Sequence, residues 1–325
     1  MSDIKLFRLS NGQASELQGN ASDLEKPLQT LIEANLGPLL SIRFLASEHS
    51  TGKTHGGRID SLGLDENNCP LILEYKRSVG ENVINQGLFY LDWLMDHKAE
   101  FKLLVLDKLG QSAADAIDWS APRVVCIAAD FTKYDGHAVQ QIGRNIELIR
   151  YRRFGDDLLL LESANLGGEA GGTKPSKGSK VIVPPALLTA PDSASPAKTP
   201  GPDKSYTEIR ANLPEPMVQL LTSLEDYVFS LGDDVQRKEL RLYAAFKRLK
   251  NFATVVLHRK NCLLLYLHTD PAKALPALTN ARDVSNIGHW GTGNLEVALS
   301  NLADLDAVKP FINSAYEGRA ATASQ

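Results

Sequence analysis

Two carboxylates and one amine lie close together in the first quarter of the chain. Asp60 ends the short segment 57–60, and Glu74 and Lys76 follow on the apolar segment 71–76. Successive side chains of a β-strand point to opposite faces, so Glu74 and Lys76 share one face if segment 71–76 is a strand. Pairing with segment 58–64 would bring Asp60 to that face. Two acidic oxygen donors beside an amine suit a hard divalent cation and a water nucleophile.

The apolar context of these charges favours a site over an ordinary surface. Residues 71–73 read Leu-Ile-Leu, so Glu74 and Lys76 emerge from a strand that we expect to be buried. Buried charges are costly unless they are paired or bound to a metal. The alternative is a solvated hairpin face that carries ordinary charges.

A helix is predicted directly after this hairpin, over residues 83–98. Gln86 and Tyr90 are four residues apart within it, so they lie on the same helical face. They could position a phosphate or the lysine. The alternative is a polar helix face on which Tyr90 covers the core.

These residues together resemble the PD-(D/E)xK nuclease superfamily, with a RecB- or NucS-like core. Asp60, Glu74 and Lys76 match its motif, although Ile59 stands where the motif has proline, and Gln86 and Tyr90 resemble the QxxxY motif of RecB-type members. The resemblance implies that Asp60 and Glu74 hold Mg²⁺ or Mn²⁺. It also implies that Lys76 activates water and stabilises charge on phosphate, and that Gln86 and Tyr90 assist.

An additional acid from the first helix often completes such sites in the superfamily. Glu25 and Glu33 are candidates because they are eight residues apart, a little over two helical turns, and we favour Glu25 as a catalytic residue. Glu48 is a third choice. A favourable interaction with the helix dipole would explain Glu25 without any metal.

Several basic residues of the first domain are predicted to contact nucleic acid. Backbone phosphates could be held by Lys53, Arg58, Arg77 and Arg144 without reading the base sequence. A charged and solvated strand edge is the alternative interpretation.

Composition predicts a folded cytoplasmic protein of two domains. The 325 residues are 43% hydrophobic and carry a net charge of −4, which neither requires nor excludes a nucleic-acid partner. Three widely spaced cysteines indicate neither a disulfide framework nor a structural zinc site. The N-terminus lacks the apolar core of a signal peptide, and no run of eighteen apolar residues predicts a membrane helix.

Changes in composition divide the chain into three parts. Residues 1–162 are predicted as an α/β domain with a mixed, restriction-endonuclease-like sheet, in the order helix, three strands, helix, strand that the resemblance implies. Residues 163–204 are rich in Gly, Pro and Ser and predict a flexible linker. Residues 205–325 resemble a small α+β domain of unknown function that is often appended to such modules in bacterial proteins. Apolar segments 102–107 and 123–129 predict buried strands, and segment 238–250 predicts a helix.

The function favoured by these observations is that of a Mg²⁺-dependent endonuclease or exonuclease acting on DNA, in repair or in defence against foreign DNA. One alternative is a nucleic-acid-binding protein on a nuclease-like fold that does not cut. Another is a regulatory interaction protein whose C-terminal domain senses a ligand or a protein partner. The basic residues of segment 238–250 could form a second nucleic-acid face. A homodimer stays open, since no self-complementary surface is visible in the sequence.

Overall fold

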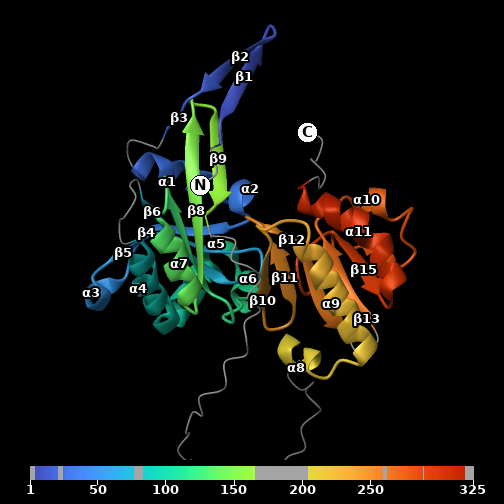
Figure 1. Ribbon diagram of the computed structural model, residues 1–325. Coiled ribbons are helices and arrows are strands. Elements are labelled where there is room, and N and C mark those ends of the chain that lie inside the picture. Colours follow the sequence, from blue (N-terminus) through green and yellow to red (C-terminus); the bar gives the residue numbers. More distant parts are fainter. Residues whose placement is uncertain are drawn as a thin grey trace, which may run out of the picture.

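The computed structural model of the protein describes residues 4–20, 25–76, 83–164, 204–258, 262–287 and 289–318. Two separate sheets with their helices lie side by side, and a two-stranded ribbon projects from the first of them (Figure 1). The ribbon consists of β1 (Leu6–Ser10) and β2 (Gln13–Leu17).

The first sheet has seven strands in the order β3, β8, β7, β6, β5, β4, with β9 also paired to β8. Strands β6, β7 and β8 are parallel to one another, whereas β5 is antiparallel to both of its neighbours, so the sheet is mixed. The strands are β3 (Gly19–Asn20), β4 (Arg43–Ser50), β5 (Arg58–Leu64), β6 (Pro70–Lys76), β7 (Arg123–Ala128), β8 (Asn145–Phe154) and β9 (Leu158–Ser163).

Helices cover both faces of this sheet. On one face α1 and α2 pack against residues such as Leu73 and Ile127, and on the other face α4 and α5 pack against residues such as Ile72 and Cys126. Central strands that are parallel and covered on both sides become continuously apolar, as residues 71–73 are. The helices are α1 (Glu25–Ala34), α2 (Leu36–Leu40), α3 (Gly52–His55), α4 (Val83–Asp96), α5 (Lys98–Leu109), α6 (Gln111–Asp115) and α7 (Lys133–Gln141).

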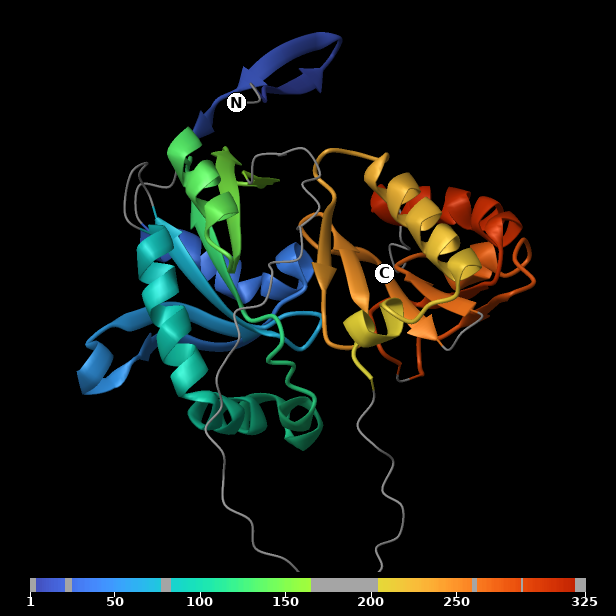
Figure 2. The same ribbon diagram turned by 60° about the horizontal axis from the view of Figure 1, so that its bottom comes forward.

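The second sheet is antiparallel and has the strand order β10, β11, β12, β13, β15, β14. Helices α9 and α11 lie together on one of its faces (Figure 2). Its elements are α8 (Tyr206–Arg210), α9 (Glu215–Phe229), β10 (Gln236–Glu239), β11 (Ala244–Lys247), β12 (Asn251–His258), β13 (Cys262–Leu267), α10 (Pro271–Ala274), β14 (Ala281–Asp283), β15 (Leu295–Leu299) and α11 (Leu302–Tyr316).

The predicted fold class is confirmed: a mixed α/β sheet forms the first part of the chain and a smaller α+β unit forms the second. The order α1, β4, β5, β6, α4 and then β7 is the expected order of helix, three strands, helix and strand. The predicted linker, residues 163–204, lies almost entirely outside the described residues. Within the described ranges, no helix is both long and apolar enough to cross a bilayer.

Two predicted elements are wrong. Residues 102–107, predicted as a strand, belong to α5, where Phe101 and Val105 are buried but Leu103 is 66% exposed. Buried positions four residues apart fit a helix. The run of apolar residues was therefore wrongly interpreted as a buried strand. Residues 238–250, predicted as a helix, contain β10 and β11 instead. In β11, Phe246 enters the core beneath α9 while Lys247 points to the other face, so strand alternation prevails.

Candidate active site

Asp60 and Glu74 lie opposite each other on neighbouring strands of the first sheet. The register of β5 and β6 matches Ser61 with Leu73, so the next pair is Asp60 and Glu74. The backbone N–H of Asp60 donates to Glu74 Oε1 at 3.3 Å, and the N–H of Tyr75 donates to Asp60 Oδ2 at 2.9 Å. Carboxylate oxygens therefore take the place of ladder carbonyls at this end of the hairpin. The local hairpin brings the two predicted metal ligands together.

Glu74 is a buried acid that lacks full compensation. Its side chain is 0% exposed, and Oε2 accepts no hydrogen bond from the described residues. Burial, followed by the nearby charge of Asp60, raises the pKa of Glu74 to about 9. Burial also raises the pKa of Asp60. A bound cation would favour the ionised form of both groups, because an opposite charge lowers the pKa of a carboxyl.

Lys76 stands at the end of β6 beside these acids. Its side chain is 16% exposed, and its Nζ lies 3.8 Å from Glu25 Oε2 at the start of α1. The structure therefore places Glu25 next to the lysine, and both lie at the same end of the hairpin as Asp60 and Glu74. Glu25 can orient the amine, while Lys76 is near enough to the acids to lower the pKa of Asp60 and Glu74 against the effect of burial.

Glu48 is a further acid at the same level of the sheet. The register of β4 and β5 matches His49 with Ile59, so Glu48 is level with Asp60. Its backbone has a φ of 52°, in the left-handed region that non-glycine residues rarely adopt. Its carboxylate lies 2.7 Å from the Nζ of Lys26 and 3.2 Å from Nη1 of Arg58. From the sequence, Glu48 was the third candidate for the additional acid, because the pairing of β4 with β5 cannot be deduced from the sequence.

Tyr90 fixes the start of β5. Its hydroxyl accepts a hydrogen bond from the backbone N–H of Arg58 at 3.1 Å, and Gln86 Nε2 is 3.5 Å away. A Cβ at Gly57 would lie 2.6 Å from the Tyr90 ring, so this close approach requires glycine. Gln86 and Tyr90 therefore adjoin the hairpin through its backbone, two residues before Asp60. In this arrangement they position the strand that carries Asp60.

Two histidine side chains that precede β5, one in β4 and one in α3, support the same arrangement. The His55 ring lies 5.2 Å from the ring of Phe89, and the His49 ring lies 5.2 Å from that of Trp93, centroid to centroid. Both aromatic residues belong to α4, so the end of β4 and the loop around α3 are packed onto the helix that bears Tyr90. These contacts hold α4 against the hairpin.

The four basic residues predicted to contact nucleic acid do not lie together. Lys53 in α3 and Arg58 in β5 are exposed near the acidic end of the hairpin. Arg77 lies outside the described residues. Arg144 precedes β8, and the parallel register places it at the opposite end of the sheet from Glu74. It lines a small pocket between the two domains, so it stands apart from the acidic site.

The polar side of α1 was missed in the sequence, apart from its two acids. Glu25, Gln29 and Glu33 recur every four residues, a spacing that gives one helical face. Gln29 donates to the carbonyl oxygen of Asp60 at 2.8 Å, and Glu33 accepts a hydrogen bond from Ser61 Oγ at 2.6 Å. The fourfold spacing was the available signal. Its target could not be known before α1 was packed against β5.

The donor set fits a cation that keeps part of its water shell. Among the residues that the structure describes, no three His, Cys, Asp or Glu side chains are grouped closely enough to hold a metal ion. Asp60 and the unpartnered oxygen of Glu74 offer two carboxylates. Mg²⁺ commonly binds proteins through one or two carboxylates and retains several waters. The pair therefore suits Mg²⁺ or Mn²⁺ better than a metal that needs a closed shell of protein ligands.

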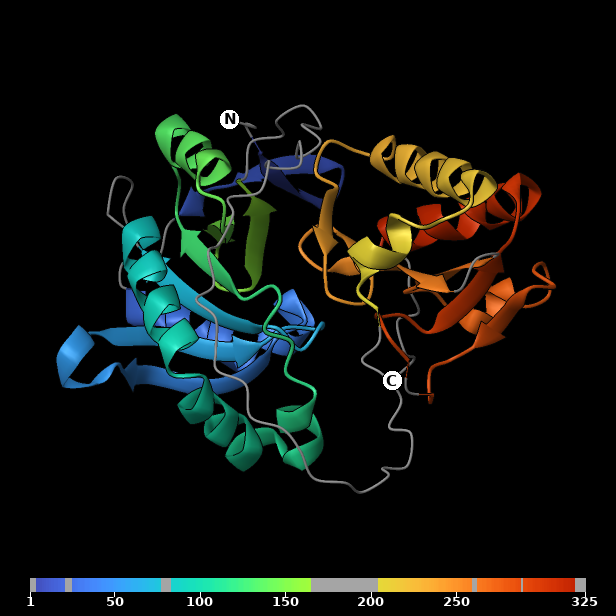
Figure 3. The same ribbon diagram turned by 90° about the horizontal axis from the view of Figure 1, so that it is seen from below.

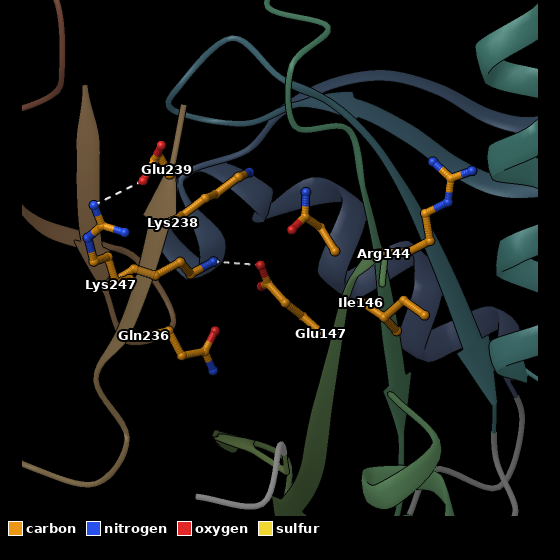
Figure 4. A pocket seen from close by; sticks show the side chains of 9 residues that line it. Arg144, Ile146, Glu147, Gln236, Lys238, Glu239 and Lys247 are labelled. Atoms are coloured by element: carbon orange, nitrogen blue, oxygen red, sulfur yellow. Dashed lines mark hydrogen bonds and ion pairs between the residues drawn. The ribbon is translucent and has the colours of Figure 1, made fainter. Parts of the chain in front are cut away.

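A second cluster of buried charges lies at the other end of the same hairpin, where the two domains meet. Asp65, in the turn between β5 and β6, lies 3.3 Å from both Arg123 Nε and Lys238 Nζ. Glu147 on β8 lies 2.6 Å from Arg123 Nη1. It also lies 2.8 Å from Lys247 Nζ, and Figure 4 shows this pair. We call these five residues the interdomain charge cluster. Strands β10 and β11 carry its two lysines on the side of the second domain that faces the first (Figure 3).

The prediction of a second nucleic-acid face in segment 238–250 is wrong for Lys238 and Lys247. Lys247 is 2% exposed, and the side chain of Lys238 is 9% exposed. Both amines are paired with acids of the first domain. A lysine that is buried against a carboxylate within its own chain is not available to a phosphate backbone.

Comparison with known proteins identifies the second domain only by an uninformative name. Residues 206–318 match a domain of unknown function (DUF5655), as the sequence predicted for this part of the chain. The whole chain is 28% identical over 318 residues to an "uncharacterized protein" of Haemophilus influenzae, covering 97% of this chain and 100% of that protein.

Similarities to solved structures are slight. A structure titled as an EndoMS–dsDNA2 complex has 16% sequence identity and a TM-score of 0.23, with 40% of this chain and 48% of that chain covered. The crystal structure of a repair endonuclease from Pyrococcus abyssi has 14% identity and a TM-score of 0.22, with 40% and 49% covered. This chain thus spans about half the length of each. At these TM-scores neither similarity identifies an activity for this chain.

Proposed function

We propose that this protein is a metal-dependent nuclease that hydrolyses phosphodiester bonds of DNA. The observation that carries the proposal is the pairing of half-buried Asp60 with fully buried Glu74 beside the amine of Lys76. Glu74 Oε2 has no hydrogen-bond partner among the described residues. Burying an acid whose pKa is raised this far lowers the stability of the fold. Its presence at the end of β6 therefore indicates a functional role for the carboxylate. The resemblance of Asp60, Glu74 and Lys76 to the PD-(D/E)xK motif supports the assignment.

Asp60 and Glu74 would hold the cation between two strands. A bound Mg²⁺ supplies positive charge that polarises a phosphodiester and favours deprotonation of a water nucleophile. Asp60 keeps its carboxylate in place through the N–H of Tyr75, and Glu74 Oε1 is held by the N–H of Asp60. Both acids therefore present their remaining oxygens from a fixed backbone, which reduces reorganisation during reaction.

Lys76 would place its ammonium group against the reacting phosphate. It lies at the strand end, with Glu25 3.8 Å away to orient it. An ammonium there stabilises negative charge that develops on a non-bridging oxygen, or hydrogen-bonds the attacking water. Lys53 and Arg58, exposed at the same end, would contact the neighbouring phosphates of the strand.

Cleavage assays with matched variants test this proposal. Wild-type protein is incubated with supercoiled plasmid, single-stranded DNA and RNA, each with Mg²⁺, Mn²⁺ or EDTA. We expect cleavage of DNA that EDTA abolishes. We expect Asp60→Asn, Glu74→Gln and Lys76→Met each to lower the rate by roughly 10³-fold, about 4 kcal/mol of transition-state stabilisation. Asp92→Asn removes an exposed acid of α4 and should cut like the wild type.

Two outcomes would contradict the proposal. Equal cleavage by the wild type and the three site variants would identify a contaminating nuclease. Binding of DNA by the wild type without cleavage under any divalent cation would favour the non-cutting alternative. Preference for RNA over DNA would retain the chemistry and change the substrate.

A further inference from the structure

Gln29 is a buried polar residue in the middle of helix α1. It is 4% exposed, although it has no place in the predicted motif. Glutamine is seldom fully buried unless its amide is hydrogen-bonded, so its partners show what it does. Those partners belong to the strands that carry the acidic site.

The amide nitrogen of Gln29 faces three oxygen atoms. Nε2 lies 2.8 Å from the carbonyl oxygen of Asp60, 2.9 Å from Glu33 Oε1 and 3.2 Å from Ser47 Oγ. On its other side, Oε1 accepts a hydrogen bond from Lys26 Nζ at 3.2 Å. The opposite orientation of the amide would set its oxygen against a carboxylate and a carbonyl. The surrounding groups therefore determine which way the amide points.

The contact with Asp60 acts on the backbone that aims a proposed metal ligand. The N–H of Asp60 is already engaged by Glu74 Oε1, and its carbonyl is engaged by Gln29. Both peptide groups of this residue are thus held, one by the neighbouring strand and one by the helix. A side chain whose backbone is held at both ends has little freedom to turn away from Glu74.

The neighbouring position is held by the same helix. Glu33, which accepts from Gln29, also accepts from the Ser61 hydroxyl at 2.6 Å. Helix α1 is therefore hydrogen-bonded to two successive residues of β5, Asp60 and Ser61. The backbone ladder between β5 and β6 ends at Ser61, so these hydrogen bonds hold β5 at the point where that ladder stops.

We propose that Gln29 is a positioning residue of the acidic site, which holds the Asp60 backbone so that its carboxylate and that of Glu74 meet on one cation. The inference rests on the proposed function, because it gives the pair a cation to bind. Gln29 itself touches neither the cation nor the substrate. Partners that orient metal ligands typically change metal affinity or activity by 10- to 100-fold when they are removed.

The test compares two variants that keep the length of the side chain. Gln29→Met removes both N–H donors and keeps the volume, and Gln29→Glu keeps the shape but offers acceptors to acceptors. Binding of Mn²⁺ is titrated by electron paramagnetic resonance without nucleic acid, and cleavage is measured separately. We expect the dissociation constant for Mn²⁺ to rise at least about 10-fold in both variants, with the larger rise in Gln29→Glu.

Two controls separate positioning from packing. Thr30→Ala removes an adjacent exposed hydroxyl that bonds only within the helix, to Lys26 O at 2.9 Å, and should leave Mn²⁺ affinity unchanged. Thermal unfolding without metal gives the stability of every variant. Should Gln29→Met fail to fold, Gln29→Glu, which keeps a polar group in the same place, carries the test alone.

The possible outcomes are distinguishable. A weakened Mn²⁺ affinity in a folded Gln29 variant supports the inference. Unchanged affinity, with or without a lower melting temperature, overturns it and leaves Gln29 a residue of the core. If the wild type itself binds no Mn²⁺ and cuts no DNA, the proposed function fails and the inference falls with it.

Discussion

The hairpin of β5 and β6 carries buried acids at both of its ends, and the two ends treat them differently. At the turn, burial alone would raise the pKa of Asp65, but Arg123 and Lys238 outweigh burial and lower it. At the open end, burial and the proximity of Asp60 raise the pKa of Glu74 to about 9. The cations around Asp65 outweigh its burial, whereas the nearby Lys76 does not outweigh the burial of Glu74.

This difference distinguishes buried acids that are paired within the protein from the buried acid that, in the proposed function, would be paired with a bound cation. In the interdomain charge cluster, burial would raise the pKa of Glu147, yet Arg123 and Lys247 hold it below its usual range. At the acidic end, Lys76 lowers the pKa of Glu74 but does not outweigh its burial, and the same amine lies 3.8 Å from Glu25. Under the proposed function, a bound cation would supply the positive charge that offsets the burial of Glu74. The four predictions that follow test this contrast, from the largest expected effect to the smallest.

Removing Arg123 should have the largest effect. Arg123→Met would leave Asp65 and Glu147 without the guanidinium that pairs with both, at 3.3 and 2.6 Å. Breaking a buried ion pair from one side typically costs about 3–5 kcal/mol, so we expect a loss of at least about 4 kcal/mol in the free energy of unfolding. Urea denaturation measures it. A loss near zero would mean that the guanidinium of Arg123 does not pair with these two acids.

The same substitution should have opposite signs at the two ends. Glu147→Gln removes a charge that is paired with two cations, and we expect it to destabilise by about 3 kcal/mol. At pH 8 the metal-free protein must take up a proton at Glu74 on folding, because its pKa rises to about 9, whereas glutamine is neutral without one. We therefore expect Glu74→Gln to stabilise the metal-free protein at pH 8 by about 2 kcal/mol.

Urea denaturation in EDTA measures both variants. In Mg²⁺ the gain from Glu74→Gln should shrink, because only the wild type can then be stabilised by the cation. If both substitutions destabilise equally, the two clusters do not differ in the way described.

The two ends also predict opposite limbs of the pH profile. An unfolded chain releases the Glu74 proton near its usual pKa of 4.5, whereas the folded chain releases it near 9. The folded state therefore holds the extra proton between these values, and its stability falls as pH rises, by up to about 1.4 kcal/mol per unit. Asp65 and Glu147 have lowered pKa values, so their contribution is present above the unfolded values and is lost as pH falls below them.

Unfolding by urea from pH 2 to pH 9 in EDTA would reveal both limbs. Glu74→Gln should flatten the alkaline limb and leave the acid limb in place. An alkaline limb that is unchanged in this variant would assign the loss of stability to other groups.

An exposed ion pair should show the smallest effect. Lys102 and Asp115 are 3.0 Å apart, but their side chains are 51% and 56% exposed. Water screens such a pair, and lysine and alanine are both good helix formers. Lys102→Ala should therefore leave the urea midpoint within experimental error. A clear loss would show that charge pairing matters in this protein irrespective of burial.

Local sequence predicted the part of the site that one hairpin and the next helix can build. Asp60, Glu74 and Lys76 meet because β5 and β6 are neighbours in the chain and the register follows from their turn. Tyr90 reaches Arg58 because helix α4 follows that hairpin and packs back onto it. For these residues, alternation and spacing contained enough information.

Residues that depend on distant pairing could not be placed in this way. Arg144 was assigned to the site because it is basic, but the parallel register of β7 and β8 places it at the far end. Lys247 was assigned to a solvent-facing helix, but it lies in a strand and pairs with Glu147, one hundred residues earlier. Glu48 and Gln29 were undervalued or missed because their partners on β5 are set by strand pairing and by helix packing.

The amino-acid sequence alone determined the acidic hairpin, its apolar burial and the polar stripe on α1, since these follow from periods of two and about four along the chain. Tertiary structure alone decided which buried charges are compensated, because compensation depends on distances between groups far apart in sequence. Asp65 is paired by Arg123 and Lys238 only once the two domains meet. Glu74 keeps a raised pKa because Lys76, which lowers it, does not offset the effect of burial.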